Sequence, residues 1–247
     1  MKIEVISIFP TLVEHWFQQG VVGRALGRVA QLRYHNPRDY SSDKFGRIDD
    51  RPFGGGSGML MQYEPLARIA EALRREADPD SAGPFNIYLS PQGVPLQQNL
   101  IQALAQKPHL AFWCGRYEGI DQRFLDRHID LEVSLGDFVI SGGEMAAAVM
   151  IDAILRQIDG VLGNQQSAQE DSFQQGLLDC PHYTRPEIVD RMRVPPVLLS
   201  GNHGEIQRWR LQQALGATFL RRPDIFNQLQ LSDKQMALLN DFLKDLT

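Results

Sequence analysis

The chain has 247 residues, of which 43% are hydrophobic and 22% charged, and its formal net charge at pH 7 is −5. This composition is that of an ordinary globular protein and excludes the collagen-like, low-complexity and disordered classes. Two cysteines, Cys114 and Cys180, are too few for a disulfide framework, and no window of about 18 residues is both apolar and uncharged. We therefore expect a cytoplasmic protein without a membrane span.

The charge is distributed unevenly along the chain. Residues 24–53 and 181–226 each carry seven Arg or Lys against four Asp or Glu, a net charge of +3, whereas residues 114–144 and 145–180 are each at −4. All seven cations of 181–226 are arginines, which suit phosphate and base contacts. Solvated surface is the simpler interpretation of such segments, and RNA contact is the alternative.

Short apolar segments alternate with helical patterns over the first two thirds of the chain. The apolar segments are rich in β-branched or aromatic residues, and the helical patterns have apolar residues three and four positions apart. This alternation predicts an α/β domain with a mainly parallel sheet. The predicted strands are 2–8, 85–90, 109–114 and 131–135, and the predicted helices are 64–77, 96–106, 121–129 and 144–157.

Residues 158–180 do not continue this alternation of strands and helices. The segment is rich in Gln and Gly and has little periodicity, which is typical of a linker. After it, Asn202 with Glu205 and Ser232 with Gln235 have the spacing of capping boxes. They predict helices at 203–215 and 233–246 in an all-helical C-terminal part.

Three predicted strands run directly into loops that contain glycine, namely 88–93, 114–119 and 135–143. Ligands of open α/β sheets bind beyond the carboxyl ends of strands, so these loops predict one shared pocket. The sequence contains neither G-x-G-x-x-G nor Gly-Lys-Ser/Thr, which disfavours dinucleotide and polyphosphate sites. Four nearby carboxylates favour a cationic or zwitterionic ligand unless they merely lie at the surface: Glu118, Asp121, Asp137 and Glu144.

Other candidate residues are ambiguous by themselves. The glycine cluster within 49–58 indicates a loop that is either flexible or shaped for a ligand. An Asp in a polar loop, such as Asp171, is usually solvated, and an Arg at a helix end, such as Arg156, usually complements the helix dipole.

Many blocks of the sequence, in their order and spacing, resemble the bacterial tRNA (guanine-N1)-methyltransferases, the TrmD family. The blocks are NPRDY, DDRPFGGGSGM, YLSPQG, CGRYEGID, GDFVISGGE, GVLG, EDSF, GLLDCPHYTRP and VPPVLLSGNH. The resemblance implies a SPOUT-class methyltransferase domain with a deep C-terminal trefoil knot at 1–160, a flexible linker at 161–178, and a small helical tRNA-binding domain at 179–247. It also implies a homodimer that transfers a methyl group from S-adenosylmethionine to N1 of guanosine 37 of tRNA, next to the anticodon.

The same resemblance implies the site residues. Asp171 matches the general base and Arg156 the residue that steadies the guanine oxygen. Magnesium use is implied as well, although the sequence indicates no ligands for it. The implied cofactor-binding residues are Leu89, Ser90, Pro91, Gly115, Tyr117, Glu118, Leu135, Gly136, Asp137, Phe138, Val139, Ile140, Gly142 and Gly143.

The chain departs from the family pattern at Phe138, where Tyr is frequent, and at Ser57, where Pro is frequent. Two other functions remain open at this point: a knotted methyltransferase acting on another RNA, and a non-catalytic RNA-binding factor. The EDSF and GLLDCPHYTRP blocks argue against the first, and the intact cofactor loops and Asp171 argue against the second.

Overall fold

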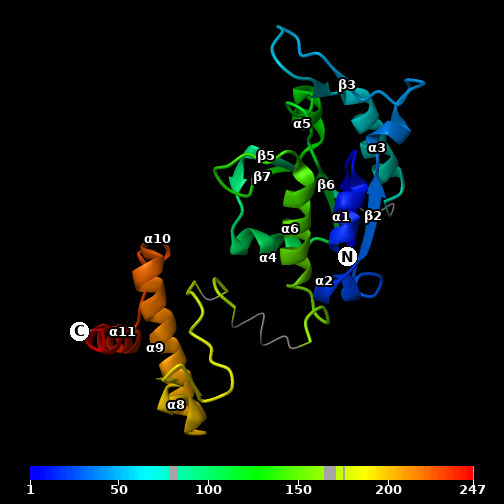
Figure 1. The fold of residues 1–247 in the computed structure, drawn as a ribbon. Helices are drawn as coiled ribbons and strands as arrows, with labels where there is room; N and C mark the ends of the chain where they lie inside the picture. Colours follow the sequence, from blue (N-terminus) through cyan, green and yellow to red (C-terminus); the bar gives the residue numbers. More distant parts are fainter. Residues whose placement is uncertain (78–82, 164–170, 175, 247) are drawn as a thin grey trace. The chain divides into compact units, whose positions relative to one another are not determined.

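The computed structural model describes residues 1–77, 83–163, 171–174 and 176–246 (Figure 1). The chain divides into two compact units, Met1–Gly163 and Asn164–Thr247. Each unit is described by itself. The predicted linker includes residues 164–170 and 175, which lie outside the described ranges. Among the described residues, no helix combines the length and apolarity that a membrane crossing requires.

The first unit is built on a five-stranded parallel sheet, as the alternating pattern predicted. Its strand order is β2-β1-β6-β5-β7, so each strand pairs in parallel with its neighbours. In chain order the strands are β1 Lys2–Ile6, β2 Gln31–His35, β5 Phe85–Pro95, β6 His109–Trp113 and β7 Leu131–Ser134. The pairing of β5 with β7 is interrupted between Leu89 and Val94, which both lie opposite Val133. The residues between them are therefore free to form a loop at the end of the sheet.

Helices cover both faces of this sheet, because successive strand residues point to opposite faces. On one face Ile3 and Val5 pack with α1 Pro10–Trp16, α2 Gly20–Ala25, α4 Gln98–Ala105 and α6 Gly143–Leu155. On the other, Ile6 and Trp113 pack with α3 Tyr63–Arg75 and α5 Gln122–His128. The short helix η1 Pro37–Tyr40 and the hairpin β3 Asp49–Asp50 with β4 Leu60–Met61 complete the unit.

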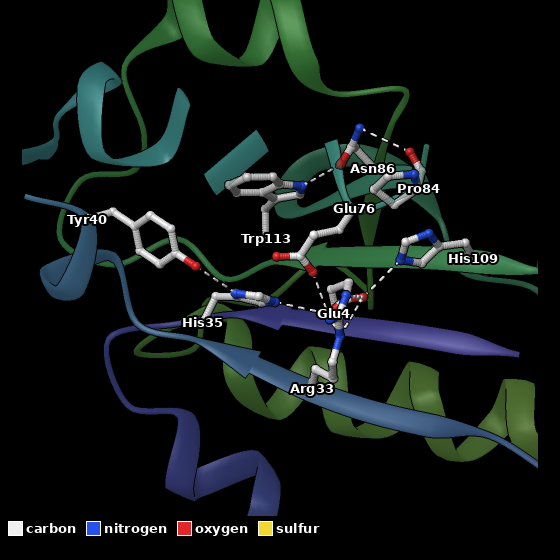
Figure 2. Close-up of polar contacts among 9 residues, drawn as sticks. All are labelled: Glu4, Arg33, His35, Tyr40, Glu76, Pro84, Asn86, His109 and Trp113. Carbon is white, nitrogen blue, oxygen red and sulfur yellow. Dashed lines mark hydrogen bonds and ion pairs between the residues drawn. The ribbon is translucent and has the colours of Figure 1, made fainter. Parts of the chain in front are cut away.

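A buried polar cluster lies on the α3 and α5 face (Figure 2). The Glu4 side chain on β1 is fully buried and accepts hydrogen bonds from Arg33, His35 and His109. Arg33 also bonds Glu76. The cluster joins the three neighbouring strands β2, β1 and β6 through side chains as well as through the backbone.

The second unit is mainly helical, with α8 Pro196–Leu199, α9 His203–Arg221, α10 Pro223–Phe226 and α11 Asp233–Lys244. Helix α9 packs against α11, where the ring of Phe242 lies so close to Gly216 that a Cβ there would be 2.3 Å from it. The side chain of Asn202 accepts the N–H of Glu205, and Ser232 with Gln235 forms the complete predicted capping box. The expectation of an all-helical C-terminal part is wrong in one respect: β8 Ile188–Val189 and β9 Met192–Arg193 form a hairpin.

Candidate functional site

The irregular part of β5 around Leu89–Val94 and the loops that follow β6 and β7 meet around one cavity of about 270 Å³. They lie at the carboxyl ends of neighbouring parallel strands, the usual position of a ligand site in an open α/β sheet. The cavity is lined by Tyr88, Leu89, Ser90, Pro91, Gly115, Arg116, Tyr117, Glu118, Gly119, Val133, Ser134, Leu135, Gly136, Phe138, Val139, Ile140, Ser141, Gly142, Gly143 and Ala146.

Thirteen of the fourteen residues implied as cofactor-binding are among these lining residues. The exception is Asp137, which is exposed and is not among the described lining residues. Seven further residues line the cavity, and four of them lie in the glycine-containing loops that were predicted to form the pocket: Tyr88, Arg116, Gly119 and Ser141. The sequence did not indicate the other three, Val133, Ser134 and Ala146.

Close backbone approach shapes the cavity wall. A Cβ on Gly143 would lie 2.7 Å from the Cα of Cys114, so only glycine fits where α6 begins against the loop after β6. Tyr117 adopts a φ of 60°, which is costly for a residue with a large side chain. Burial raises the pKa of Tyr88 to about 12, so its hydroxyl stays protonated at neutral pH. Neutral and backbone groups thus dominate the wall.

The four carboxylates expected near the pocket have different surroundings. Glu118 lines the cavity, and its backbone N–H donates to the carbonyl of Met59 at 3.0 Å, directly after the glycine cluster. Asp121 instead caps α5 and pairs with Arg123 at 2.6 Å. Glu144 is buried and paired with Arg116. Among the four, Glu118 alone is among the described lining residues, and its carboxylate lies close to Gly58 of the glycine cluster.

The two proposed catalytic residues belong to different units. Arg156 follows α6 as its C-cap residue in the first unit. Asp171 begins a turn in the second unit, in which the N–H of Gln174 donates to the Asp171 carbonyl at 3.3 Å. Phe173 in the same turn donates its N–H to Leu177 at 2.7 Å, and its ring lies 5.7 Å from the guanidinium of Arg222. These contacts attach the turn to its own unit.

One group of described residues has donor atoms close enough to hold a metal ion: Asp179, Cys180 and His182. His182 Nε2 lies 2.7 Å from the carboxylate of Asp179. Although burial alone would raise the pKa of Asp179, the hydrogen bonds from His182 and from the Cys180 N–H hold it below its usual value. A thiol and an imidazole suit zinc better than magnesium, which prefers oxygen donors. The Asp179, Cys180 and His182 group therefore does not match the implied magnesium ion.

Comparison with known proteins identifies the family. The family model described as tRNA (Guanine-1)-methyltransferase TrmD matches residues 1–228. A tRNA (guanine-N(1)-)-methyltransferase of Photorhabdus laumondii is 51% identical over 99% of this chain and 97% of its own length. Proteins of the same name from Pasteurella multocida and Yersinia enterocolitica are 51% and 50% identical, over 97% and 99% of this chain and 97% and 99% of their own lengths. The chain belongs to the tRNA (guanine-N1)-methyltransferase family.

Proposed function

We propose that this protein transfers a methyl group from S-adenosylmethionine to N1 of guanosine 37 in tRNA. Family membership over residues 1–228 carries this proposal. An identity of about half over nearly the whole chain favours the same reaction over methylation of another RNA, and the intact pocket loops disfavour a non-catalytic RNA-binding role.

The cavity suits S-adenosylmethionine chemically. Apolar side chains such as Leu89, Leu135 and Ile140 offer a surface for an adenine ring, and the surrounding glycine-containing loops offer backbone groups to its polar edge. The carboxylate of Glu118 complements the positive charge of the ammonium or sulfonium group. When bound, the cofactor supplies an electrophilic methyl group.

The reaction requires a base and a cation. Guanine N1 carries a proton, and its lone pair attacks the methyl carbon only as this proton leaves. As the new N–C bond forms, the methyl–sulfur bond breaks and the neutral thioether S-adenosylhomocysteine leaves. We assign the proton to the carboxylate of Asp171. A carboxylate with an ordinary pKa of about 3.9 is a weak base for so weak an acid. The guanidinium of Arg156 therefore has a matching role at guanine O6, where it stabilises the negative charge that develops as N1 is deprotonated. No step here depends on magnesium.

The chain's organisation follows the family in this proposal. Residues 1–160 form the knotted methyltransferase domain, 161–178 a linker that folds over the cofactor when tRNA arrives, and 179–247 the tRNA-binding domain. The arginine-rich segment 181–226 includes the aromatic pair Tyr183 and Trp209, with ring centroids 6.3 Å apart. Arginines and aromatic rings suit single-stranded RNA bases and their phosphates.

An exposed apolar face supports a homodimer. Leu12 and Trp16 lie one turn apart on α1 and are about half exposed, at 48% and 50%. Met145 and Val149 lie one turn apart on α6, which contacts α1 (Figure 1). An exposed apolar patch across two packed helices is typical of an interaction surface. A second copy of the chain is the partner that we propose for this face.

Replacing Asp171 by Asn tests the catalytic assignment. We expect single-turnover methyl transfer to fall at least about 100-fold, because a positioned base contributes roughly that much. Binding of S-adenosylmethionine should be unchanged, since the lost group acts on the tRNA base. Calorimetry for cofactor binding and labelled-methyl transfer for turnover measure the two effects.

Asp245→Asn is the matched control, because Asp245 is an exposed carboxylate at the end of α11 in the same unit. It should retain full turnover. If Asp171→Asn turned over as fast as Asp245→Asn, Asp171 would not be the base.

A further inference from the structure

A buried carboxylate beside the pocket joins three separate segments. Glu144, in the first turn of α6, is only 1% exposed. Ser7, which follows β1, donates its hydroxyl hydrogen to Glu144 Oε1 at 2.5 Å. Arg116, in the loop after β6, donates from Nε to Glu144 Oε2 at 2.9 Å, and its Nη2 lies 2.9 Å from the same oxygen. Elements far apart in the sequence therefore converge on one acid.

Arg116 carries this connection into the pocket. Its Nη1 donates to the carbonyl oxygen of Ser141 at 3.0 Å, in the loop after β7. A Cβ on Gly142 would lie 2.3 Å from Arg116 Nε, so the loop presses directly against the guanidinium. The backbone N–H of Gly143 also donates to the carbonyl of Gly115 at 3.1 Å, which joins the same two loops. Arg116 thus fixes the spacing between two loops that form opposite parts of the cavity wall.

Ser7 and Glu144 do not belong to the wall itself. Neither is among the described residues that line the cavity, and both are buried. The Ser7 oxygen also accepts the N–H of Phe9 at 2.9 Å, which ties the start of α1 to the same cluster. The Phe9 ring lies 4.8 Å from the guanidinium carbon of Arg116. A planar guanidinium held by a carboxylate on one edge and a carbonyl on another has one orientation, because its donors form a rigid fork.

We propose that Glu144 and Ser7 are positioning residues for cofactor binding: they hold Arg116, and Arg116 holds the Ser141–Gly143 loop in the shape that admits S-adenosylmethionine. This inference rests on the proposed function. It assigns a role to a carboxylate that contacts no ligand. The loop contains Gly142 and Gly143, and the guanidinium of Arg116 donates a hydrogen bond to its backbone at Ser141.

The affinity for S-adenosylmethionine, measured by calorimetry without tRNA, tests the proposal. In Glu144→Gln one carboxylate oxygen becomes an N–H donor, which cannot accept from Arg116. We expect its dissociation constant to rise about 10-fold or more, and that of Ser7→Ala about 3-fold. Turnover at saturating cofactor should change less than the dissociation constant. The matched control is Glu71→Gln on α3, which removes an exposed carboxylate paired with Arg75 at 3.2 Å and should bind as the original protein does.

A double variant separates positioning from stability. Removing one member of a buried ion pair destabilises a protein, whereas replacing both by uncharged groups often does not. Arg116→Met combined with Glu144→Gln should therefore recover the unfolding midpoint while its cofactor affinity stays low, since the contact to the Ser141 carbonyl is gone. Recovery of affinity together with stability would show a merely structural role and overturn the proposal.

Amide hydrogen exchange of residues 136–143 without cofactor gives an independent readout. We expect faster exchange there in Glu144→Gln than in Glu71→Gln. If the unaltered protein failed to bind S-adenosylmethionine, the proposed function would be lost while this exchange still decided the role of Glu144. Unchanged exchange and unchanged affinity in Glu144→Gln would reject the positioning role alone.

Discussion

The carboxylate of Glu4 is the most completely paired acid of the sheet. Arg33 Nη2 lies 2.6 Å from it, and a ring nitrogen of His35 and of His109 each lies 2.9 Å away (Figure 2). Burial alone would raise the pKa of Glu4, but the hydrogen bonds from His109, His35 and Arg33 hold it well below its usual range. Glu4→Gln removes the charge that these partners share. We expect it to lower the free energy of unfolding at pH 7 by about 3 kcal/mol, measured by urea denaturation.

The pH dependence of the unfolding free energy follows from the lowered pKa of Glu4. A carboxyl whose pKa is lower in the folded than in the unfolded chain stabilises the fold above its unfolded pKa, about 4.3 for Glu. That contribution is lost as the pH falls toward the folded value. The stability difference between the original protein and Glu4→Gln should therefore be full above about pH 5 and shrink below about pH 4. A difference that stayed constant from pH 7 to pH 3 would contradict this account.

At the scale of elements, α11 shows how local sequence sets a boundary. Ser232 Oγ accepts the N–H of Gln235 at 3.4 Å, and Gln235 Oε1 accepts the N–H of Ser232 at 2.9 Å. Ser232→Ala removes the cap, and we expect a loss of about 1 kcal/mol in unfolding free energy. Ser232→Asp retains an acceptor and should remain within a few tenths of the original value. Equal losses in both variants, seen by thermal unfolding, would show that the cap contributes little.

The sequence predicted elements well where one pattern dominated. The strands β1, β5, β6 and β7 contain short segments rich in β-branched or aromatic residues, and α3 buries Leu66, Ile69 and Leu73 at helical spacing, so all were predicted. Strand β2 was missed because its Arg33 and His35 bond Glu4, a partner that a local pattern does not reveal. Helix α1 was missed because its apolar residues Leu12 and Trp16 are exposed.

Some residues of the candidate site could likewise be predicted from the local sequence, and others could not. Glycine-containing loops after strands can be recognised from the local sequence, and they predicted the position of the pocket. The resemblance to the family then implied thirteen of the residues that line the cavity. Arg116 and Ser141 lie in two of the predicted pocket loops, but the hydrogen bond between them was not predicted because it joins residues 25 positions apart. Glu144 was expected either as a pocket charge or as a surface carboxylate. Its burial was not predicted because its partner Ser7 is 137 residues away in the sequence.

At the scale of the whole molecule, the net charge of −5 is the sum of acidic and basic segments that lie in different parts of the chain. The acidic segment 114–144 supplies two of the three pocket loops, but Asp121 and Glu144 are paired with arginines, and Glu118 alone of the four expected carboxylates lines the cavity. The arginine-rich segment 181–226 lies in the second unit. The pocket and the arginine-rich segment thus belong to different compact units, although the basic segment 24–53 lies in the same unit as the pocket.

The most direct test of the central claim compares two tRNA substrates that differ only at position 37. The protein is incubated with labelled S-adenosylmethionine and a tRNA carrying either guanosine or adenosine there, and the labelled nucleoside is identified after digestion. Our account predicts 1-methylguanosine from the first substrate and no methylation of residue 37 in the second. Equal labelling of both tRNAs, or of neither, would contradict it.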